Sequence, residues 1–243
     1  MTWHTGRMCG FDLETTGTNP ETDRIVTACV VLVGGGHPTQ TTNWLANPGV
    51  DIPAEAAAVH GITTDRAREE GQPAGAVVQQ VVAALSQAVL AGFPIVAMNA
   101  AFDLTMLDRE ARRHRVQPLT DSVGDQLRVI DPRVLDKKID RYRRGGRTLT
   151  DLCQHYRVAL DGAHAADADA IAACRVAWRI AQQEPVIADA DLAFLHDKQT
   201  EWAAEQAAGL ADYFARTPGK EHLADGVRGD WPLAPYQQTE ATA

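Results

Sequence analysis

Short apolar runs rich in β-branched residues fill the first 46 residues, a pattern typical of β-strands. They cover Arg7–Leu13, Arg24–Val33 and Thr39–Leu45, and Gly34-Gly35-Gly36 separates the second run from the third. Two such runs joined through a glycine cluster are typical of antiparallel neighbours. The chain therefore predicts an opening three-stranded antiparallel meander.

After this segment the apolar period changes to that of a helix. Val77, Val81, Leu85 and Val89 share one face of a helix over Ala74–Leu90. The elements expected after it are a strand at Pro94–Met98, a helix at Ala101–Arg115, a strand at Gln126–Ile130, a helix opened by the capping box Thr148–Asp151 and ending at Tyr156, and a helix at Ala165–Gln183. Strands followed by strand–helix alternation predict an α/β fold with a mixed sheet flanked by helices.

A C-terminal helical extension follows this alternation. Pro185 ends the preceding helix, and Asp189–Ala215 shows one further amphipathic stripe. The tail from Arg216 to Ala243 is rich in Gly, Pro and polar residues, and we expect it to be loosely ordered. The predicted organisation is a domain over 1–184, an amphipathic helix over 185–215 and a tail over 216–243.

Composition narrows the class of protein. Of the 243 residues, 45% are hydrophobic and 23% are charged, as in an ordinary soluble protein. No apolar run approaches the roughly 18 residues of a membrane span, and the first residues hold no apolar signal-peptide core. The four cysteines form no CxxC pair, which argues against a zinc site or a disulfide scaffold. We expect a cytoplasmic protein without a membrane partner.

The net charge is −9, which disfavours a protein that coats nucleic acid through a basic surface. One window runs against this trend. Residues 128–147 hold eight Arg and Lys residues but three acids, Asp131, Asp136 and Asp140. This basic stripe, which includes Tyr142, is consistent either with a solvated loop or with a surface that grips phosphates.

Two carboxylates stand at the end of the first predicted strand. Asp12 and Glu14 are two residues apart, so strand alternation directs both side chains to one face. Neighbouring carboxylates repel each other unless a cation lies between them. Taken alone, the pair is also consistent with solvated acids where a strand leaves the sheet. The small residues and glycine of Thr15-Thr16-Gly17 allow close approach of a ligand to the backbone.

Further polar residues follow buried segments later in the chain. Asp103 comes just after a buried strand, at the carboxyl edge where α/β sheets build their sites. Asn99 and Asp103 are equally consistent with capping and dipole roles at a helix start. His164 and Asp169 lie around the start of the next long helix, where an acid is common for the same reason.

Taken in order, these pieces are much more specific than any one of them. Phe11-Asp12-Leu13-Glu14-Thr15-Thr16-Gly17, then Asn99 to Asp103, then His164, Ala166 and Asp169 together resemble the three motifs of the DEDDh, or DnaQ-like, 3′–5′ exonucleases. Val59-His60-Gly61-Ile62-Thr63 also looks like a segment common in that family. The resemblance covers about residues 7 to 183.

The resemblance implies an RNase H-like fold and a site for two divalent cations, Mg²⁺ or Mn²⁺. It implies that Asp12 contacts both ions, that Glu14 and Asp169 complete the first site, and that Asp103 holds the second. His164 would accept the proton of the attacking water, because an imidazole suits a base at neutral pH. Asp167 lies two residues from Asp169 and is interpreted as a solvated neighbour.

The resemblance also indicates the substrate side of the site. Thr15, Thr16 and Gly17 would line the pocket of the terminal nucleotide, beside Asn99. Phe102 would stack on bases or else pack in the core. His60 is interpreted as a structural loop residue.

The expected function is removal of nucleotides from a free 3′ end of single-stranded or frayed nucleic acid. The form of the first motif favours DNA, and RNA stays open because ribonuclease members share the chemistry. The expected rival is a proofreading subunit that acts docked on a polymerase through residues 185–215. The same helix could instead fold back on the exonuclease domain. DNA or RNA preference, processivity, cellular role and oligomeric state are left open.

Overall fold

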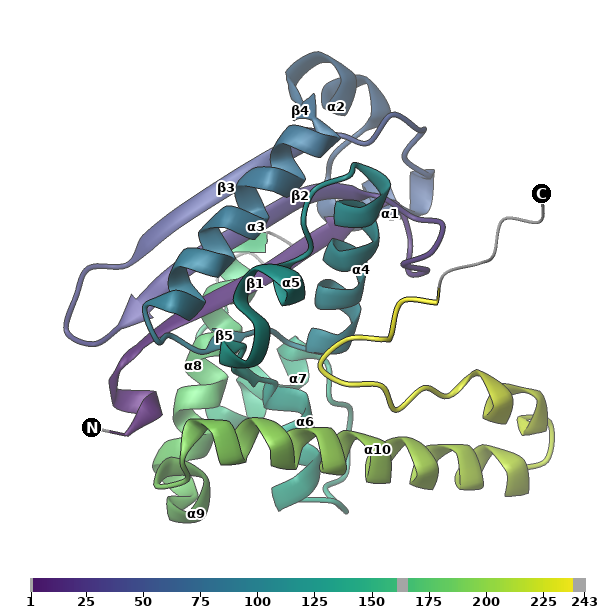
Figure 1. The fold of residues 1–243 in the computed structure, drawn as a ribbon. Helices are drawn as coiled ribbons and strands as arrows, with labels where there is room; N and C mark the ends of the chain where they lie inside the picture. Colours follow the sequence, from purple (N-terminus) through teal and green to yellow (C-terminus); the bar gives the residue numbers. More distant parts are fainter. Residues whose placement is uncertain (1, 161–165, 238–243) are drawn as a thin grey trace.

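The computed structural model describes residues 2–160 and 166–237. Its centre is a six-stranded mixed sheet, drawn in Figure 1, in the order β4-β3-β2-β1-β5-β6. The strands are β1 (Arg7–Thr15), β2 (Ile25–Gly34), β3 (Gln40–Asn47), β4 (Gln72–Pro73), β5 (Ile95–Val96) and β6 (Val129–Ile130).

The first three strands form the antiparallel meander expected from the sequence. Asp12 pairs with Cys29 of β2, and Cys29 pairs with Asn43 of β3. On its other side β1 is parallel to β5, which is parallel to β6. The prediction of an RNase H-like mixed sheet flanked by helices is confirmed.

The helices divide between the two faces of the sheet. Their bounds are α1 (Ala54–His60), α2 (Thr64–Glu70), α3 (Ala74–Leu90), α4 (Ala100–Arg113), α5 (Leu119–Val123), α6 (Pro132–Ile139), α7 (Leu149–Tyr156), α8 (Ala166–Gln183), α9 (Pro185–Ala188) and α10 (Leu192–Arg216), with 3-10 turns at η1 (Trp3–Thr5), η2 (Gly124–Gln126) and η3 (Glu221–Gly226). The face that carries Phe11 and Leu13 packs against α3 and α4. The opposite face, with Cys29 and Val31, packs against Ala170 of α8.

Helix α10 closes the open edge of the sheet. The side chain of Gln199 acts as a surrogate strand partner for β6: its Oε1 accepts from the Asp131 N–H at 2.8 Å and its Nε2 donates to the Val129 carbonyl at 2.9 Å. Gln199 and Leu195 are fully buried. Of the two arrangements considered for this helix, the first half of α10 therefore adopts the folded-back one. The domain limit at 184/185 stays a prediction.

The segment after α10 returns across the molecule, in yellow in Figure 1. Trp231 is buried in the same core cluster as α3 and α4. The Ala234 N–H donates to Thr105 Oγ1 at 2.9 Å, and Arg109 donates to the Ala234 and Pro235 carbonyls. Residues 231–235 therefore pack on α4. This packing differs from the loose order expected from the composition of the tail, which carries no sign of these contacts.

Other differences concern short helices that the sequence pattern did not predict. Helix α1 buries none of its residues and α2 buries Ala67 alone, so neither has an apolar stripe. Helix α6 lies inside the basic stripe. Helix α10 matches the stripe predicted over Asp189–Ala215, and the short α9 precedes it. No helix in the described ranges combines the length and the apolar character that a bilayer crossing needs.

Candidate active site

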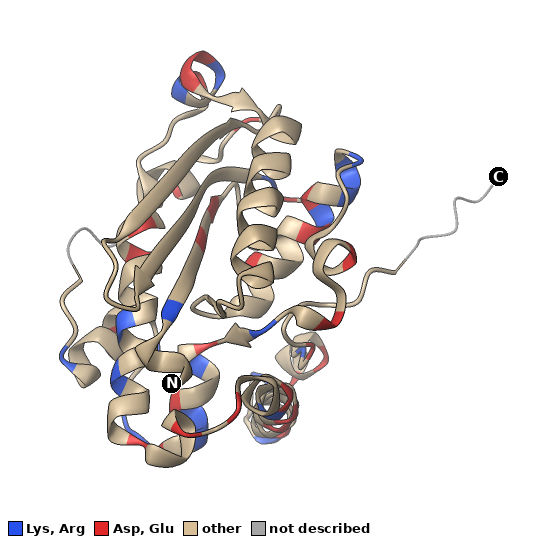
Figure 2. Ribbon diagram, turned by 60° about the vertical axis from the view of Figure 1, so that its left-hand side comes forward, with Lys and Arg blue, Asp and Glu red and all other residues tan. Residues whose placement is uncertain are grey.

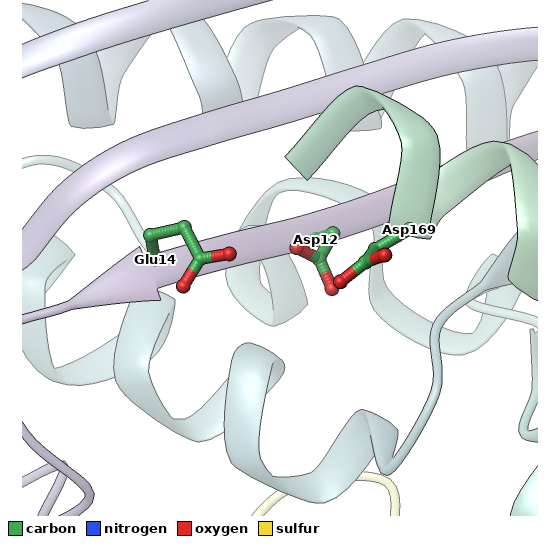
Figure 3. Close-up of side chains that lie close together, drawn as sticks. All are labelled: Asp12, Glu14 and Asp169. Carbon is green, nitrogen blue, oxygen red and sulfur yellow. The ribbon is translucent and has the colours of Figure 1, made fainter. Parts of the chain in front are cut away.

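The candidate site lies at the C-terminal end of β1, the central strand. Figure 2 shows acidic residues on this strand in the middle of the sheet. Asp12 and Glu14 project from the same face, as strand alternation requires, and Asp169 of α8 points toward Asp12 (Figure 3). One carboxylate oxygen from each of these three residues lies within 4.8 Å of the others. The structure thus brings together three of the four predicted metal ligands.

The close approach of α8 to β1 positions Asp169. Gly10, two residues before Asp12, faces the helix. A Cβ there would lie 2.8 Å from the Ala170 carbonyl oxygen and 2.9 Å from the Cys174 sulfur, both too close. Only glycine lets the helix backbone come this near to the strand. Gly10 was not predicted as a site residue, and the only sign of it in the sequence is its place beside the first motif.

The electrostatics of the cluster favour a bound cation. Burial, together with the charges of Asp103, Glu14 and Asp169, raises the pKa of Asp12 well above its usual range. Burial and the Asp169 carboxylate raise the pKa of Glu14 to about 7. Within the described ranges, no Lys or Arg side chain forms an ion pair with Asp12 or Glu14. Positive charge supplied from solution would relieve this repulsion.

Asp103 approaches the same strand from the first turn of α4. Its Oδ1 accepts from the Leu13 N–H at 3.1 Å, between the two acids of β1. The side chain is buried, and burial raises its pKa well above the usual range, although the Leu13 N–H works in the opposite direction. Asp103 lies outside the close group of Asp12, Glu14 and Asp169.

Asp131 fixes the start of α4 and was missed by the motif analysis. Its Oδ2 accepts from the Ala100 N–H at 3.0 Å, and its Oδ1 accepts from the N–H groups of Asn99 and Arg133. One buried carboxylate therefore caps both α4 and α6. Asn99 itself has a left-handed backbone, with φ of 64°, and its Oδ1 accepts from Arg133 at 2.6 Å.

The residues after the first motif are mainly engaged with the β1–β2 connection. Thr15 Oγ1 donates to the Gly17 carbonyl at 2.7 Å. Thr16 is buried, and its hydroxyl accepts from the Arg24 N–H at 3.0 Å. A Cβ on Gly17 would lie 2.5 Å from Asp23 Oδ2, so a larger residue would require the Asp23 side chain to shift. Contacts of these three residues with a nucleotide stay predictions.

Two further predicted residues have different outcomes. Phe102 is half-buried and packs against the main core cluster, in agreement with its core alternative. Its stacking on bases stays a prediction. His164 lies outside the described residues.

A groove beside Glu14 has room for a small ligand. Its volume is about 440 Å³, and it runs from Glu14 over β2 and β3 to α1. Trp44 and His60 line it, and Asp167 stands at the α8 side. His60 was expected in a loop but is the last residue of α1. Its Nδ1 accepts from the Ile62 N–H at 3.1 Å, which is a structural role.

The basic stripe divides into two sets of side chains. Arg143 and Arg147 are 3.0 and 2.7 Å from Oδ2 of the fully buried Asp136, which also accepts from the Tyr156 hydroxyl at 2.9 Å. These two arginines hold the loop after α6. Lys137, Lys138, Arg141 and Arg144 are outside that network.

The donor set at the end of β1 fits hard divalent cations. Carboxylate oxygens are the ligands that Mg²⁺ and Mn²⁺ prefer, and three converge here. Asp12, Glu14 and Asp169 could together hold one such ion.

Comparison with known proteins gives the family. A model of the RNase_T exonuclease family matches residues 9–177, well over half of the chain. DNA polymerase III PolC-type of Oceanobacillus iheyensis is 27% identical over 173 residues, which are 71% of this chain and 11% of that protein. The same enzyme of Streptococcus agalactiae is 27% identical over 176 residues, 72% of this chain and 11% of its own length. This chain therefore spans about a tenth of these relatives.

Among solved structures, E. coli Exonuclease I in complex with a dT13 oligonucleotide superposes with a TM-score of 0.62 at 18% identity. That match covers 74% of this chain and 42% of the other. Exonuclease I of Methylocaldum szegediense gives a TM-score of 0.62 at 18% identity, over 83% and 45% of the two chains. At this identity the likeness concerns the fold. From the extent of the family match and the motif residues gathered around β1, the chain belongs to the RNase_T exonuclease family.

Proposed function

We propose that the protein is a metal-dependent 3′–5′ exonuclease that removes nucleotides from single-stranded or frayed DNA ends. The observation that carries the proposal is the convergence of Asp12, Glu14 and Asp169, with one oxygen of each within 4.8 Å of the others. Family membership supports the reaction type. An arrangement of repelling, half-buried carboxylates is costly without cations, which makes a purely structural role a poor explanation.

The proposed cofactors are two divalent cations, Mg²⁺ or Mn²⁺. Asp12, Glu14 and Asp169 would hold the first, and Asp12 and Asp103 the second. When bound, such a pair stabilises negative charge on the attacking and leaving oxygens of a phosphodiester. Asp103 also fixes the β1 backbone at Leu13, so its carboxylate couples the position of α4 to that of Asp12 and Glu14.

The chain's own residues would do the remaining work. His164 would accept the proton of the attacking water on a ring nitrogen, because its usual pKa lies near neutrality. The groove of about 440 Å³ beside Glu14 would hold the terminal nucleotide, with Trp44 and His60 in its walls. Gly10 keeps Asp169 within reach by admitting α8.

The relatives favour DNA as the substrate. The segment similar to this chain occurs within proteins named DNA polymerase III PolC-type. One structural neighbour is Exonuclease I in complex with a dT13 oligonucleotide. These names support single-stranded DNA over RNA for the proposed activity.

The test is digestion of 5′-labelled single-stranded DNA and RNA with Mg²⁺, Mn²⁺ or EDTA. We expect a ladder that shortens from the 3′ end, faster on DNA, and no cleavage in EDTA. Asp12→Ala should reduce the rate by more than about 100-fold. Loss of a residue that only hydrogen-bonds to a metal ligand costs up to about 100-fold, and loss of a ligand itself costs more. His164→Ala should reduce it by about 100-fold or more and remove the acidic limb of the pH profile.

Asp169→Asn and Asp167→Asn form a matched pair on the same turn of α8. The first should abolish activity. The second removes an acid that lines the groove beside Glu14 but lies outside the carboxylate group, so kcat should stay within about threefold of wild type even if KM changes. Equal losses from both variants, or cleavage that persists in EDTA, would contradict the proposed site.

A further inference from the structure

A second groove, with a volume of about 570 Å³, runs between α6 and α10, which lie side by side in Figure 1. On the α6 side it is lined by Lys137, Lys138 and Arg141. Tyr142, Leu210 and Tyr213 also line the groove. We call it the α6–α10 groove. One acid lies on its rim, Glu205, 3.7 Å from Lys138.

The cations of this groove are poorly neutralised by the protein. Arg143 and Arg147 of the same stripe are paired with buried Asp136, but neither Lys137 nor Arg141 forms a salt bridge within the described ranges. Burial and the nearby charges of Arg133 and Arg147 lower the pKa of Lys137. An anion placed beside Lys137 would offset the repulsion from these arginines and favour the charged form of the lysine.

Aromatic rings are interleaved with these cations. Tyr142 is 85% exposed, and the Arg141 guanidinium lies 5.6 Å from the centre of its ring. Tyr213 is 54% exposed on the opposite wall. Solvent-exposed tyrosines beside basic side chains offer stacking faces for bases, a combination that suits single-stranded nucleic acid regardless of sequence.

A smaller hollow connects the α6–α10 groove with Asn99, one of the predicted site residues. Asn99 precedes Asp103 by four residues, about 6 Å along α4. Its Oδ1 accepts from Arg133, and Lys137 lies one turn further along α6, again about 6 Å. The smaller hollow, of about 130 Å³, is lined by Asn99, Arg133 and Lys137, and it shares Lys137 and Leu210 with the α6–α10 groove. Arg133 and Lys137 thus connect the start of α4 with the α6–α10 groove.

We propose that the α6–α10 groove binds the sugar–phosphate backbone of single-stranded DNA several nucleotides upstream of the 3′ end being hydrolysed. The polarity of the bound strand, with its 3′ end at the carboxylates, rests on the proposed function. Lys137, Lys138 and Arg141 contact phosphates, and Tyr142 and Tyr213 stack on bases. One wall is the C-terminal helix, so the extension contributes directly to substrate affinity. The groove retains a long strand after each cleavage, while the terminal nucleotide occupies the site beside Glu14.

The test compares a groove variant with a matched control. The groove variant is Lys137→Gln, Lys138→Gln and Arg141→Gln. The control is Arg68→Gln, Arg115→Gln and Arg179→Gln. It removes the same charge from sites that line neither the groove beside Glu14 nor the α6–α10 groove. Binding of a labelled single strand of about 20 nucleotides is measured by fluorescence anisotropy in EDTA, so that no cleavage occurs. It is repeated at several salt concentrations.

The groove variant should bind the long strand at least tenfold more weakly than the control. The slope of log affinity against log salt should decrease by about 2, because each lost phosphate contact changes it by about 0.7 for single strands. KM for the long DNA should rise in proportion, with kcat unchanged. Hydrolysis of the p-nitrophenyl ester of thymidine 5′-monophosphate, which is too small to reach the groove, should be unchanged.

Equal affinity and equal salt slope in the two variants would overturn the proposal, even if the protein is an exonuclease. Loss of ester hydrolysis in the groove variant would also overturn it, because the groove would then act on the site itself. If the wild type and both variants hydrolyse no substrate, the proposed function fails. The binding comparison in EDTA still shows whether the α6–α10 groove binds single-stranded DNA. Tighter binding of RNA than DNA would overturn the assignment to DNA.

Discussion

At the scale of single residues, the candidate site depends on a few side chains around β1 whose positions have different physical origins. Asp12 and Glu14 share a face because strand side chains alternate, and the structure has this arrangement. The roles of Gly10 and Asp131 could not be predicted in this way. Gly10 depends on how close α8 comes, and Asp131 caps helices at two places more than 30 residues apart. Neither the Gly10 contact with α8 nor the Asp131 cap on α4 has a local signal in the sequence.

The raised pKa of Glu14 predicts a pH-dependent stability in EDTA. Its carboxyl holds a proton to about pH 7 in the folded state, against an ordinary value of 4.5 in the unfolded chain. The folded state therefore binds more protons between these values, and the stabilisation present below pH 4.5 is lost as the pH rises toward 7. Because Glu14 is partly exposed, we expect a loss of only about 1 kcal/mol.

Thermal unfolding in EDTA checks this prediction. Glu14→Gln should reduce the fall in Tm as the pH rises toward 7, and it should raise Tm at pH 8 by about 2–4 °C over wild type. Glu69→Gln, at an exposed position of α2, should leave the wild-type pH dependence intact. Millimolar Mn²⁺ should remove most of the difference between wild type and Glu14→Gln, because a cation neutralises the same repulsion. A pH profile identical in Glu14→Gln and wild type would contradict this account.

At the scale of elements, the long periodic segments were predictable and the short ones were not. The three strands of the meander and α3 carry their own apolar pattern, so their bounds agree to within a few residues. Helix α1 has no buried residue, and its position depends on the β3–α3 connection rather than on an apolar stripe. The element that matters most for the site is α8. Its close approach to β1 depends on the absence of a side chain at Gly10.

Gly10→Ala tests whether the depth of α8 places Asp169. The added methyl would lie within 3 Å of atoms of Ala170 and Cys174, so the helix must shift outward. We expect a loss of about 1–3 kcal/mol in stability and a larger relative loss of metal-dependent activity. Gly226→Ala, which meets no neighbour within 4 Å, is the matched control and should change neither quantity.

The two readouts are the free energy of unfolding in urea and the Mn²⁺ concentration at half-maximal activity. The metal requirement should rise at least about tenfold in Gly10→Ala, as expected when a metal ligand is mispositioned. A destabilised variant with an unchanged metal requirement would show that α8 shifts without moving Asp169.

At the scale of the whole molecule, the mixed sheet and its flanking helices could be predicted from the sequence. The order of all six strands and the packing of residues 217–237 could not. Arg109 on α4 reaches the Ala234 and Pro235 carbonyls, more than 120 residues later in the chain. The tail has the Gly- and Pro-rich composition of a loose segment, and a single buried tryptophan is too sparse a pattern to predict packing. Such contacts depend on where α4 and α10 leave exposed apolar surface.

Trp231→Ala tests whether this segment is part of the cooperative unit. Trp231 packs into the main core, with its ring centre 5.0 Å from that of His196 on α10. Its removal should cost about 3–5 kcal/mol, the usual range for a buried tryptophan. Tyr236→Ala, at a half-exposed ring over Arg112, should cost less than about 1 kcal/mol.

The same segment is connected to the candidate site through α4. The Ala234 N–H donates to Thr105 on the helix that carries Asp103, so loss of the segment should also shorten the half-life of activity on heating while activity at 25 °C persists. A single cooperative urea transition, shifted in Trp231→Ala and nearly unmoved in Tyr236→Ala, would show that the C-terminal segment folds together with the catalytic half. Two separate transitions would show that it docks independently.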